Sequence, residues 1–297
     1  MTNIKGCDLS KWEKGLKIND VIKAGYQFAI IRGGYTGYGI LRVKNVDPCF
    51  EDFYKQAKAL DFSVGCYYYS CANTKKGGVD EAEYFYKKCL KGKKFEYPIY
   101  IDVEESRWQA DDKTGVTDAI LGFWETLTAK GYLVGVYSSP RWFEKKIDTA
   151  RLENVTKWVA SWQSKAPEVS FSGFDLWQNS DNGSVGGHKI DTDVSFVDFP
   201  AVIKANGLNG YVVLKSVDEI VAEIFKNKWG KGSTRKKKLT EAGYDYNKVQ
   251  ARVNEYSRIA REVKNGKWGK GSARKEALKK AGYDYDLVQT LVGELSR

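Results

Sequence analysis

The chain has 297 residues, a net charge of +10 and many aromatic side chains. It contains no apolar run of about 18 residues, which argues against a membrane span. Its single histidine, His188, argues against a histidine-based catalytic triad. The five cysteines show no CxxC spacing, so we expect buried free thiols, no metal site and no cofactor.

The start of the chain bears on where the protein is made. Residues 1–7 contain no apolar core of the length that a secretory signal peptide needs. We therefore expect synthesis in a reducing cytosol. If the protein acts outside that cell, we expect another factor to release it.

The positive charge is concentrated near the C-terminus. Residues 1–216 carry 29 basic and 27 acidic side chains, whereas residues 217–297 carry 19 and 11. The C-terminal segment therefore predicts an anionic partner. Nucleic acid, membrane lipid and an anionic cell wall all fit this charge.

Residues 1–210 alternate between β-like and α-like segments. The pattern predicts strands at 5–9, 27–33, 63–69, 98–104, 133–138, 157–162, 174–178 and 189–193, with helices such as 48–60, 79–90 and 116–130 between them. Eight strands with interleaved helices favour an α/β fold, an irregular (β/α) barrel; a doubly wound open sheet is the main alternative. No GxGxxG or phosphate-loop pattern follows a strand, which disfavours nucleotide binding.

The segment 97–105 reads as a buried strand that ends in carboxylates. Its apolar residues alternate with Tyr100, Asp102 and Glu104, so Asp102 and Glu104 share one face, roughly 6–7 Å apart along the strand. Two acids this close do not titrate alike, because one is pushed toward protonation while the other stays ionised. Glycosidic bond cleavage needs such a pair. The alternative is a strand that runs into an ordinary acidic loop.

Further acids and aromatics lie near the ends of other predicted strands. In a β/α barrel the C-terminal strand ends meet at one face, where they would form a carboxylate cup ringed by aromatic rings, as in a polysaccharide cleft. For a single aspartate, helix capping is the usual role, and for a single aromatic, core packing is the alternative. The residues concerned are Asp8, Asp102, Glu104 and Asp191, with Tyr67, Tyr68, Tyr69, Tyr137, Trp162 and Trp177.

The C-terminal region is an internal repeat. Residues 218–256 and 257–295 are identical at 20 of 39 positions. Each copy predicts three short helices, which in the first copy fall near 219–226, 233–241 and 246–256, with Ser233 and Ser272 as N-caps and Gly243 and Gly282 as helix stops. The predicted core of the first copy is Ile220, Ile224, Leu239, Val249 and Val253.

Six segments of residues 3–205, in the right order, resemble the strands of the glycoside hydrolase family 25 lysozymes. They are Gly-Cys-Asp-Leu-Ser-Lys-Trp at 6–12, Phe-Ala-Ile-Ile-Arg at 28–32, Val-Gly-Cys-Tyr-Tyr-Tyr at 64–69, Ile-Asp-Val-Glu at 101–104, Leu-Trp-Gln at 176–178 and Ile-Asp-Thr-Asp-Val at 190–194. The chain departs from the family pattern at Tyr68 and Tyr69, where His and Phe are more usual, and at Asp193, where Asn is common. Asp191 is therefore the better match to the family's active-site Asp.

The resemblance implies a peptidoglycan hydrolase that needs no metal. Glu104 would donate a proton to the glycosidic oxygen between N-acetylmuramic acid and N-acetylglucosamine, with its pKa raised by the charge of Asp102. Asp102 would stabilise the positive charge at the anomeric carbon or orient the acetamido group, while Asp8 and Asp191 complete an acidic floor. Substrate-binding residues would be Tyr67, Tyr69, Tyr137 and Trp177. The closest type is a phage endolysin, made in the host cytosol and acting on the bacterial cell wall after release.

The 39-residue units resemble a wall-binding repeat found C-terminal to such lysozymes, which implies binding to the glycan–peptide unit of peptidoglycan and, through charge, to anionic wall polymers. Packing inside the small unit is the alternative role for the aromatic residues. The candidate contacts are Arg235, Arg274, Trp229, Trp268, Tyr244 and Tyr283, with the basic run 236–238. The expected domains are a catalytic barrel at 1–208, a linker at 209–217, and repeats at 218–256 and 257–297.

Three other functions stay open at this point. A chitinase-like hydrolase also carries Asp-x-Glu after its fourth strand, but Phe95, Tyr97 and Ile99 replace the acidic residues expected upstream. A non-catalytic wall-binding protein would be indicated by loss of Asp102 or Glu104, and both are present. The basic repeats could also bind nucleic acid, but they contain no recognised nucleic-acid-binding motif, so we expect no nucleic-acid partner.

Overall fold

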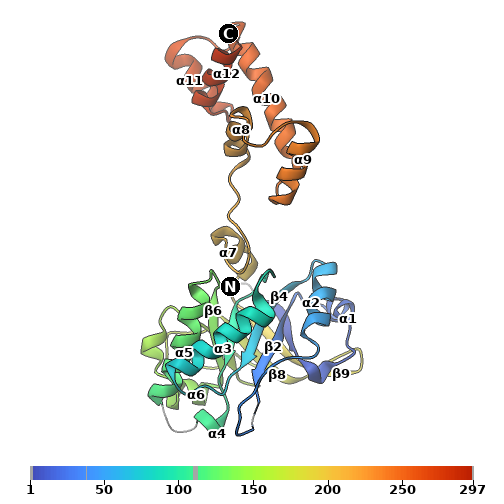
Figure 1. Cartoon of the computed structure of the whole chain (residues 1–297), viewed down its shortest axis with the longest axis vertical. Helices are drawn as coiled ribbons and strands as arrows, with labels where there is room; N and C mark the ends of the chain where they lie inside the picture. The colour runs from blue at the N-terminus through green and yellow to red at the C-terminus, as the bar shows by residue number, and fades with distance from the viewer. Residues whose placement is uncertain (1–2, 38, 110–112, 296–297) are drawn as a thin grey trace. The chain divides into compact units, whose positions relative to one another are not determined.

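The computed structural model describes residues 3–37, 39–109 and 113–295, and the chain divides into two compact units, Met1–Val213 and Leu214–Arg297 (Figure 1). Within the described residues, no helix combines the length and the apolar character that crossing a membrane requires. The five cysteines are free and buried, as expected.

Eight strands of the first unit close into a barrel. The order around it is β1-β9-β8-β7-β6-β5-β4-β2, and β1 pairs with β2 to complete the ring, which excludes the open doubly wound sheet. The eight barrel strands are β1 (Ile4–Leu9), β2 (Phe28–Thr36), β4 (Ser63–Tyr69), β5 (Ile99–Asp102), β6 (Val134–Ser138), β7 (Thr156–Ala160), β8 (Leu176–Val185) and β9 (His188–Ser195), and β3 (Lys44–Val46) lies outside the ring.

The barrel is irregular at its last strand. Strand β9 runs antiparallel to both β8 and β1, whereas the other ring neighbours pair in parallel. The N-terminal half of β9 therefore lies beside the C-terminal ends of its neighbours. Strand β3, which the sequence did not predict, forms a hairpin with the end of β2.

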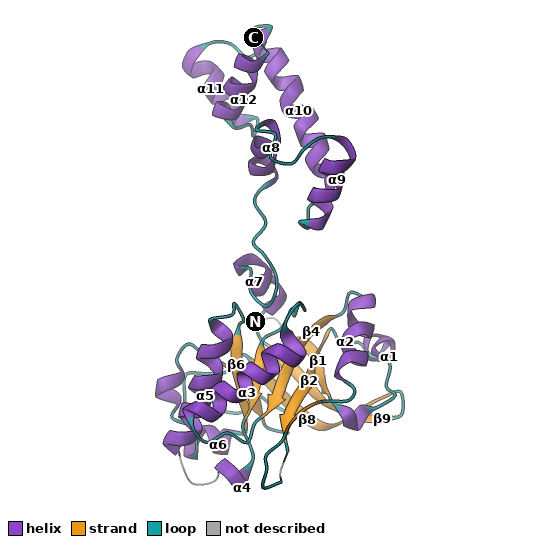
Figure 2. Cartoon of the chain, viewed as in Figure 1, coloured by secondary structure: helices purple, strands orange, loops and turns teal. Residues whose placement is uncertain are grey.

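Helices surround the barrel, and α3 and α5 lie together over one side of the sheet (Figure 2). They are α1 (Ile18–Lys23), α2 (Phe50–Ala59), α3 (Lys75–Phe85), α4 (Ser106–Gln109), α5 (Lys113–Thr128), α6 (Pro140–Lys145) and α7 (Phe199–Asn206), with short turns η1 (Lys11–Glu13), η2 (Tyr86–Leu90) and η3 (Thr149–Leu152). Apolar residues on both sides of the strands are buried, so one core fills the barrel and another lies between barrel and helices.

Large aromatic side chains fill the barrel interior. Tyr100 and Trp158 are buried there, with ring centroids 5.2 Å apart. Gly135 on β6 makes room for them, because a Cβ at this position would lie 2.4 Å from the Tyr100 ring. Above this layer, toward the C-terminal strand ends, the interior opens into a cavity.

The segment after α7 closes the other end of the barrel. Asn209 is fully buried; its Oδ1 accepts from the Leu133 N–H at 2.7 Å and its Nδ2 donates to the Tyr97 carbonyl at 2.8 Å. These contacts fix the entries to β6 and β5. The barrel unit thus includes the start of the segment expected as a linker at 209–217, and it ends at Val213.

The second unit consists of α8 (Val217–Phe225), α9 (Gly232–Glu241), α10 (Tyr246–Lys264), α11 (Gly271–Lys280) and α12 (Tyr285–Glu294). The predicted core of the first repeat is buried, and Gly243 and Gly282 follow their helices with φ of 87° and 78°. The predicted N-caps Ser233 and Ser272 are wrong: the caps are Lys231 and Lys270, because each helix begins at the glycine that precedes the serine.

The two repeats are joined by one continuous helix. Helix α10 is the third helix of the first repeat, and it continues without a break as the first helix of the second. The repeats therefore share a single apolar cluster.

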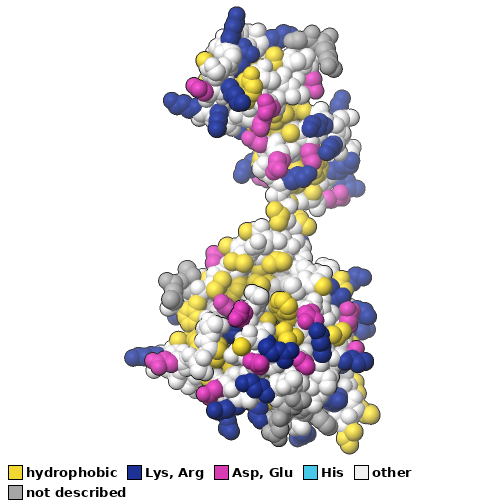
Figure 3. Space-filling model, turned by 90° about the vertical axis from the view of Figure 1, so that its left-hand side faces the viewer, with side chains coloured by type: hydrophobic (Ala, Val, Ile, Leu, Met, Phe, Trp, Pro, Cys, Tyr) yellow, Lys and Arg dark blue, Asp and Glu magenta, His cyan; other side chains and the backbone are white. Residues whose placement is uncertain are grey.

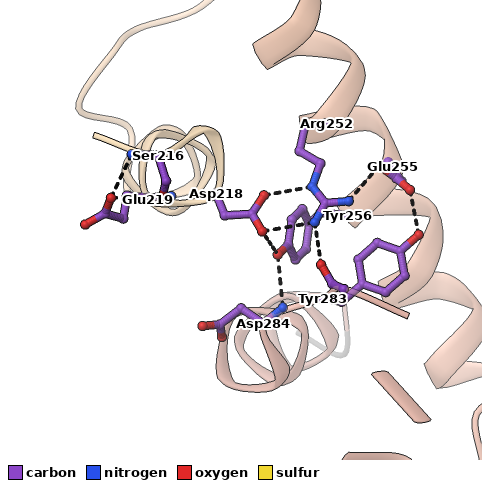
Figure 4. A network of polar contacts seen from close by, with 9 residues as sticks. Ser216, Asp218, Glu219, Arg252, Glu255, Tyr256, Tyr283 and Asp284 are labelled. Carbon is purple, nitrogen blue, oxygen red and sulfur yellow. Dashed lines mark hydrogen bonds and ion pairs between the residues drawn. The ribbon is translucent and has the colours of Figure 1, made fainter. Parts of the chain in front are cut away.

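A polar network at this junction also joins the repeats (Figure 4). Arg252 donates to both carboxylate oxygens of Asp218, at 2.7 and 3.0 Å, and to the Gly282 carbonyl at 2.6 Å. The Tyr256 hydroxyl donates to Asp218 and accepts from the Asp284 N–H. Residues of the first repeat thus hold the turn that begins α12 of the second.

Candidate active site

A cavity of about 210 Å³ lies at the C-terminal ends of the barrel strands. Its lining contains five carboxylates, one cationic side chain and a set of aromatic rings. The lining residues are Asp8, Ser10, Trp12, Glu13, Arg32, Tyr67, Tyr69, Asp102, Glu104, Tyr137, Trp158, Gln178 and Asp191. All four predicted catalytic acids therefore share one cavity, which is what a barrel with its chemistry at this face requires.

The Asp102–Glu104 pair leaves the barrel from β5. The strand ends at Asp102, two residues before the predicted end at Glu104. Asp102 is only 4% exposed, and its Oδ1 is buried without a hydrogen-bond partner among the described residues. Glu104 is exposed to the solvent of the cavity, so it is the member of the pair that an incoming substrate meets.

Both carboxyl groups of the pair are shifted toward protonation. Burial raises the pKa of Asp102 well above its usual value, the charge of Glu104 raises it further, and Arg32 opposes the change. The pKa of Glu104 is also raised, first because the cavity walls remove water around it, then by Asp191 and Glu105. Desolvation, rather than the expected charge of Asp102, is thus the main cause at Glu104.

Asp8 and Asp191 face each other on paired strands. Asp8 on β1 lies opposite Asp191 on β9 in the strand register. Asp191 reaches the cavity because β9 runs antiparallel, which brings the N-terminal half of that strand to this rim. Gln178 on β8 donates to Asp8 at 2.8 Å and to Asp191 at 3.5 Å, so one amide holds both carboxylates.

Asp8 and Asp191, the two acids at the cavity floor, also have raised pKa values. Burial and the charges of Asp193 and Asp191 raise the pKa of Asp8 well above its usual value, while the Gln178 hydrogen bond lowers it. Burial, Glu13 and Asp181 raise the pKa of Asp191 to about 6. A site with this many raised carboxyl pKa values is suited to proton transfer near neutral pH.

Asp193 lies deeper than Asp191. Its side chain is buried, and Oδ1 accepts from Trp158 Nε1 at 2.8 Å, so it supports the aromatic layer beneath the cavity. Burial, and after it the charge of Asp191, raises the pKa of Asp193 well above its usual value. Of the two aspartates on β9, Asp191 is the one that lines the cavity.

Three of the four predicted substrate-binding aromatics line the cavity, and one does not. Tyr67, Tyr69 and Tyr137 face it. Trp177 lies outside it, and its Nε1 donates to the Ser161 carbonyl at 2.8 Å. Successive side chains of a strand point to opposite faces, so on β8 the inward position falls to Gln178 instead.

Several residues at the cavity were not predicted as site residues. Trp12, after β1, lines it and is 75% exposed. Trp162, which was predicted among the aromatics near the strand ends, follows β7, is 60% exposed and donates to Gln178 Oε1 at 3.0 Å, so its ring is held near the same acids. Exposed tryptophans beside a cleft suit stacking on sugar rings. The alternation along β8 could have indicated Gln178, because this residue lies on the inward face of that strand. Trp12 lies in η1, after its strand, where no such alternation exists.

In the part of the chain that the structure describes, no group of three or more His, Cys, Asp or Glu side chains is placed so that it could hold a metal ion. The cavity chemistry described above is carried by carboxylates, hydroxyls and one guanidinium.

The predicted wall-binding residues occupy equivalent places in the two repeats. Trp229 and Trp268 are half-buried and donate to Glu223 and Glu262, each at 3.0 Å. Their rings meet Tyr244 and Tyr283 edge-on, with centroids 5.8 and 6.0 Å apart. These four aromatics therefore contribute to packing.

Arg235 and Arg274 are also half-buried. They donate to the carbonyls of Gly230 and Gly269, which order the loop before the second helix of each repeat. The basic run 236–238 is exposed. Figure 3 shows Lys and Arg side chains spread over the face of this unit that it displays.

Comparison with known proteins agrees with this architecture. The sequence profile of glycosyl hydrolases family 25 matches residues 7–188, and the CW_7 repeat matches 218–256 and 257–295. A lysozyme of Streptococcus phage Cp-7 is 28% identical over 149 residues, which is 47% of this chain and 41% of that protein. The chain thus matches less than half the length of this curated relative.

Solved structures share the fold. A bacterial lysozyme from Streptomyces coelicolor superposes with a TM-score of 0.59 at 23% identity, covering 71% of this chain and all of that one. The CTP1L endolysin gives 0.58 at 21% identity, covering 75% and 78%. A family GH25 lysozyme from Aspergillus fumigatus gives 0.56 at 20% identity, covering 69% and 99%. Because the family profile spans more than half of the chain, including Asp8, Asp102 and Glu104, this protein belongs to glycosyl hydrolases family 25.

Proposed function

We propose that the chain is an N-acetylmuramidase, which hydrolyses the β-1,4 bond between N-acetylmuramic acid and N-acetylglucosamine in peptidoglycan. Glu104 donates a proton to the glycosidic oxygen, and Asp102 as a carboxylate stabilises the positive charge that develops at the anomeric carbon. Asp8 and Asp191 orient the substrate at the floor of the cavity, and Gln178 keeps both in place.

The observation that carries the proposal is the placement of the Asp102–Glu104 pair. A buried carboxyl and a solvent-contacting carboxyl, both with raised pKa values, enter one cavity from the end of β5. The pair can therefore hold one proton and one negative charge at the same time, which is the condition for acid-assisted glycoside cleavage. Tyr67, Tyr69 and Tyr137 supply the walls against which sugar rings would pack.

The test is digestion of purified peptidoglycan, followed by borohydride reduction of new sugar ends and mass spectrometry. Reduced N-acetylmuramic acid ends support the proposal. Reduced N-acetylglucosamine ends indicate a glucosaminidase, cleavage of chitin oligosaccharides in a parallel reaction indicates a chitinase-like enzyme, and wall binding without new ends leaves a non-catalytic binding protein.

Two variants test the role of Glu104 in the same assay. We expect Glu104→Gln to lower turnover by at least about 100-fold while wall binding is retained, because a neutral amide cannot donate the proton. Glu125→Gln is the matched control, since Glu125 pairs with Lys75 on the outer surface. Substantial turnover by Glu104→Gln would exclude Glu104 as the acid.

We further propose that the CW_7 repeats hold the enzyme on the wall. Two equivalent repeats in one unit can bind together, which raises the local concentration of the barrel on an insoluble substrate. Residues 217–297, with 19 basic and 11 acidic side chains, would add attraction to anionic wall polymers that weakens with salt. We propose no nucleic-acid partner, and a gel shift with DNA at physiological salt should be negative.

Two double variants test whether wall binding depends on specific arginine contacts or only on positive charge. Arg235→Gln with Arg274→Gln should weaken wall binding more than Lys236→Gln with Lys275→Gln. Both pairs remove two charges at equivalent repeat positions, but only the arginines order the glycine loops. Equal losses in a pelleting assay would mean that charge alone matters.

The similarity to a phage lysozyme and to an endolysin supports a role in lysis from within. We propose that the protein acts on the bacterial cell wall after release from the host cell that makes it. Expression in a susceptible bacterium should cause lysis only after the membrane is permeabilised, and lysis without permeabilisation would contradict this.

A further inference from the structure

Arg32 is the one cationic side chain among the residues that line the active-site cavity. It lies on β2 above Ile30, on the strand face that points into the barrel, and pairs in register with Tyr67 of β4. Only 11% of its side chain is exposed. A buried guanidinium among five carboxylates is costly unless its charge is used.

The guanidinium is anchored by Asp47 and lies over the Tyr35 ring, 5.4 Å from its centroid. Its Nε donates to Oδ2 of Asp47 at 2.7 Å. Asp47 is fully buried and also accepts from the Lys11 and Cys49 N–H groups, so this carboxylate is a fixed support. Arg32 Nη2 is buried without a hydrogen-bond partner among the described residues.

In the same cavity, and among the described residues, Asp102 lacks a hydrogen-bond donor where Arg32 lacks an acceptor. Its Oδ1 is buried, and none of the described residues donates a hydrogen bond to it. An isolated buried carboxyl would take up a proton, which would leave two protonated acids in the pair and no negative charge for the reaction.

We propose that Arg32 is a positioning residue for this reaction: its charge holds Asp102 ionised, so that the proton of the pair stays on Glu104. This inference rests on the proposed hydrolase function. Arg32 opposes the pKa rise at Asp102, whereas the groups that shift the pKa of Glu104 are Asp191 and Glu105, after desolvation. Burial alone would favour the proton on Asp102, the more buried of the two carboxyls, and the guanidinium opposes this.

Among the described residues that line the cavity, no other side chain can replace the positive charge of Arg32. Around the cavity, β1 presents Asp8, β4 presents Tyr67 and Tyr69, β5 presents Glu104, β6 presents Tyr137, β9 presents Asp191, and η1 presents Glu13. Glu104 pushes Asp102 toward protonation, and none of the other groups named here carries a positive charge. Arg32 is the one lining residue that acts in the other direction.

The test is the pH dependence of kcat/KM on soluble peptidoglycan fragments, measured on the full chain. In Arg32→Gln the acid limb should move to higher pH by about one unit or more, because Asp102 then needs a higher pH to ionise. Arg32→Lys restores the charge and should keep the acid limb close to that of the wild type, even if its rate is lower. Arg151→Gln, which removes an exposed arginine paired with Asp118, should leave the profile unmoved.

Each result has one interpretation. A lower rate in Arg32→Gln with an unmoved acid limb would overturn the proposal, since it would show a merely structural role. An upward shift in a folded Arg32→Lys would also overturn it, which keeps the test decisive if Arg32→Gln does not fold. Failure of the wild type to release reducing ends would instead contradict the hydrolase function.

Discussion

Gln178 donates a hydrogen bond to Asp8 at 2.8 Å, across 170 positions of sequence. The same amide accepts from the Tyr137 hydroxyl and from Trp162 Nε1, both at 3.0 Å. One buried side chain on β8 therefore organises an acid on β1, an aromatic on β6 and an aromatic after β7. Closure of the barrel makes the contact with Asp8 possible, because it brings β1 beside β9, which in turn pairs with β8.

Replacing Gln178 should disturb catalysis more than stability. We expect Gln178→Leu to lower kcat/KM by about 10- to 100-fold, because Asp8 and Tyr137 lose the group that orients them. Trp177→Phe is the control on the same strand, since its side chain lies outside the cavity, and it should change kcat/KM little. A larger loss in Trp177→Phe than in Gln178→Leu would contradict this assignment of the two faces of β8.

Asp191 should make the barrel less stable at neutral pH than in mild acid. Its pKa is raised to about 6, against about 3.9 in an unfolded chain. The folded state thus binds more protons between these values, so this group's contribution to the free energy of unfolding falls as pH rises through the window. Above pH 6, where Asp191 is ionised in the folded state, its full destabilising contribution to the free energy of unfolding is present.

Asp191→Asn removes that cost. We expect it to raise the free energy of unfolding of the barrel by about 1–2 kcal/mol at neutral pH, a figure reduced for the partial exposure of the group, and to give no gain near pH 4. Calorimetry of the full chain at the two pH values measures this. Asp52→Asn, on the exposed face of α2, should change neither value. Equal stability of wild type and Asp191→Asn at neutral pH would refute the prediction.

Asn209 should be essential to the barrel although it follows the last helix of that unit. Asn209→Ala leaves the Leu133 N–H and the Tyr97 carbonyl unpaired in a buried place, and alanine is also strained at the φ of 53° found there. We expect a loss of about 2–4 kcal/mol in chemical denaturation. Asn209→Gly relieves the backbone strain but not the lost hydrogen bonds, so it should recover only part of this loss. Full recovery would show that the hydrogen bonds contribute nothing.

The two repeats should unfold together. Arg252 belongs to the first repeat but bonds to the Gly282 turn of the second, and its equivalent in the second repeat is Leu291. We expect Arg252→Met to destabilise the repeat unit by about 1–3 kcal/mol and to increase amide hydrogen exchange in both α8 and α12. Arg258→Met removes an exposed pair with Glu262 on the same helix and should cost less than about 0.5 kcal/mol. Faster exchange confined to one repeat would show that the repeats are independent.

The sequence was most informative where short-range alternation carries the signal. Alternation of apolar and polar residues predicted the strand that leads to Asp102 and Glu104. Identity at a fixed shift of 39 residues revealed the two repeats, and the preference of glycine for helix ends predicted the stops at Gly243 and Gly282. It failed at Ser233, because the helix start depends on backbone geometry at the preceding glycine. It also placed Trp177 instead of Gln178 in the cavity, since alternation fixes two faces of a strand but not which one points inward.

By itself the sequence determined the number and order of the barrel strands, the carboxylate pair after one of them, and the duplication of the tail, because these features are written in local periodicity and repetition. Only the tertiary structure decided that β9 runs antiparallel, that Gln178 joins Asp8 to Asp191, that Asn209 closes the barrel, and that Arg32 and Asp102 line one cavity. Each of these depends on contacts between segments far apart in the chain, whose energies no local pattern records. The structure also showed that α10 runs through both repeats without a break.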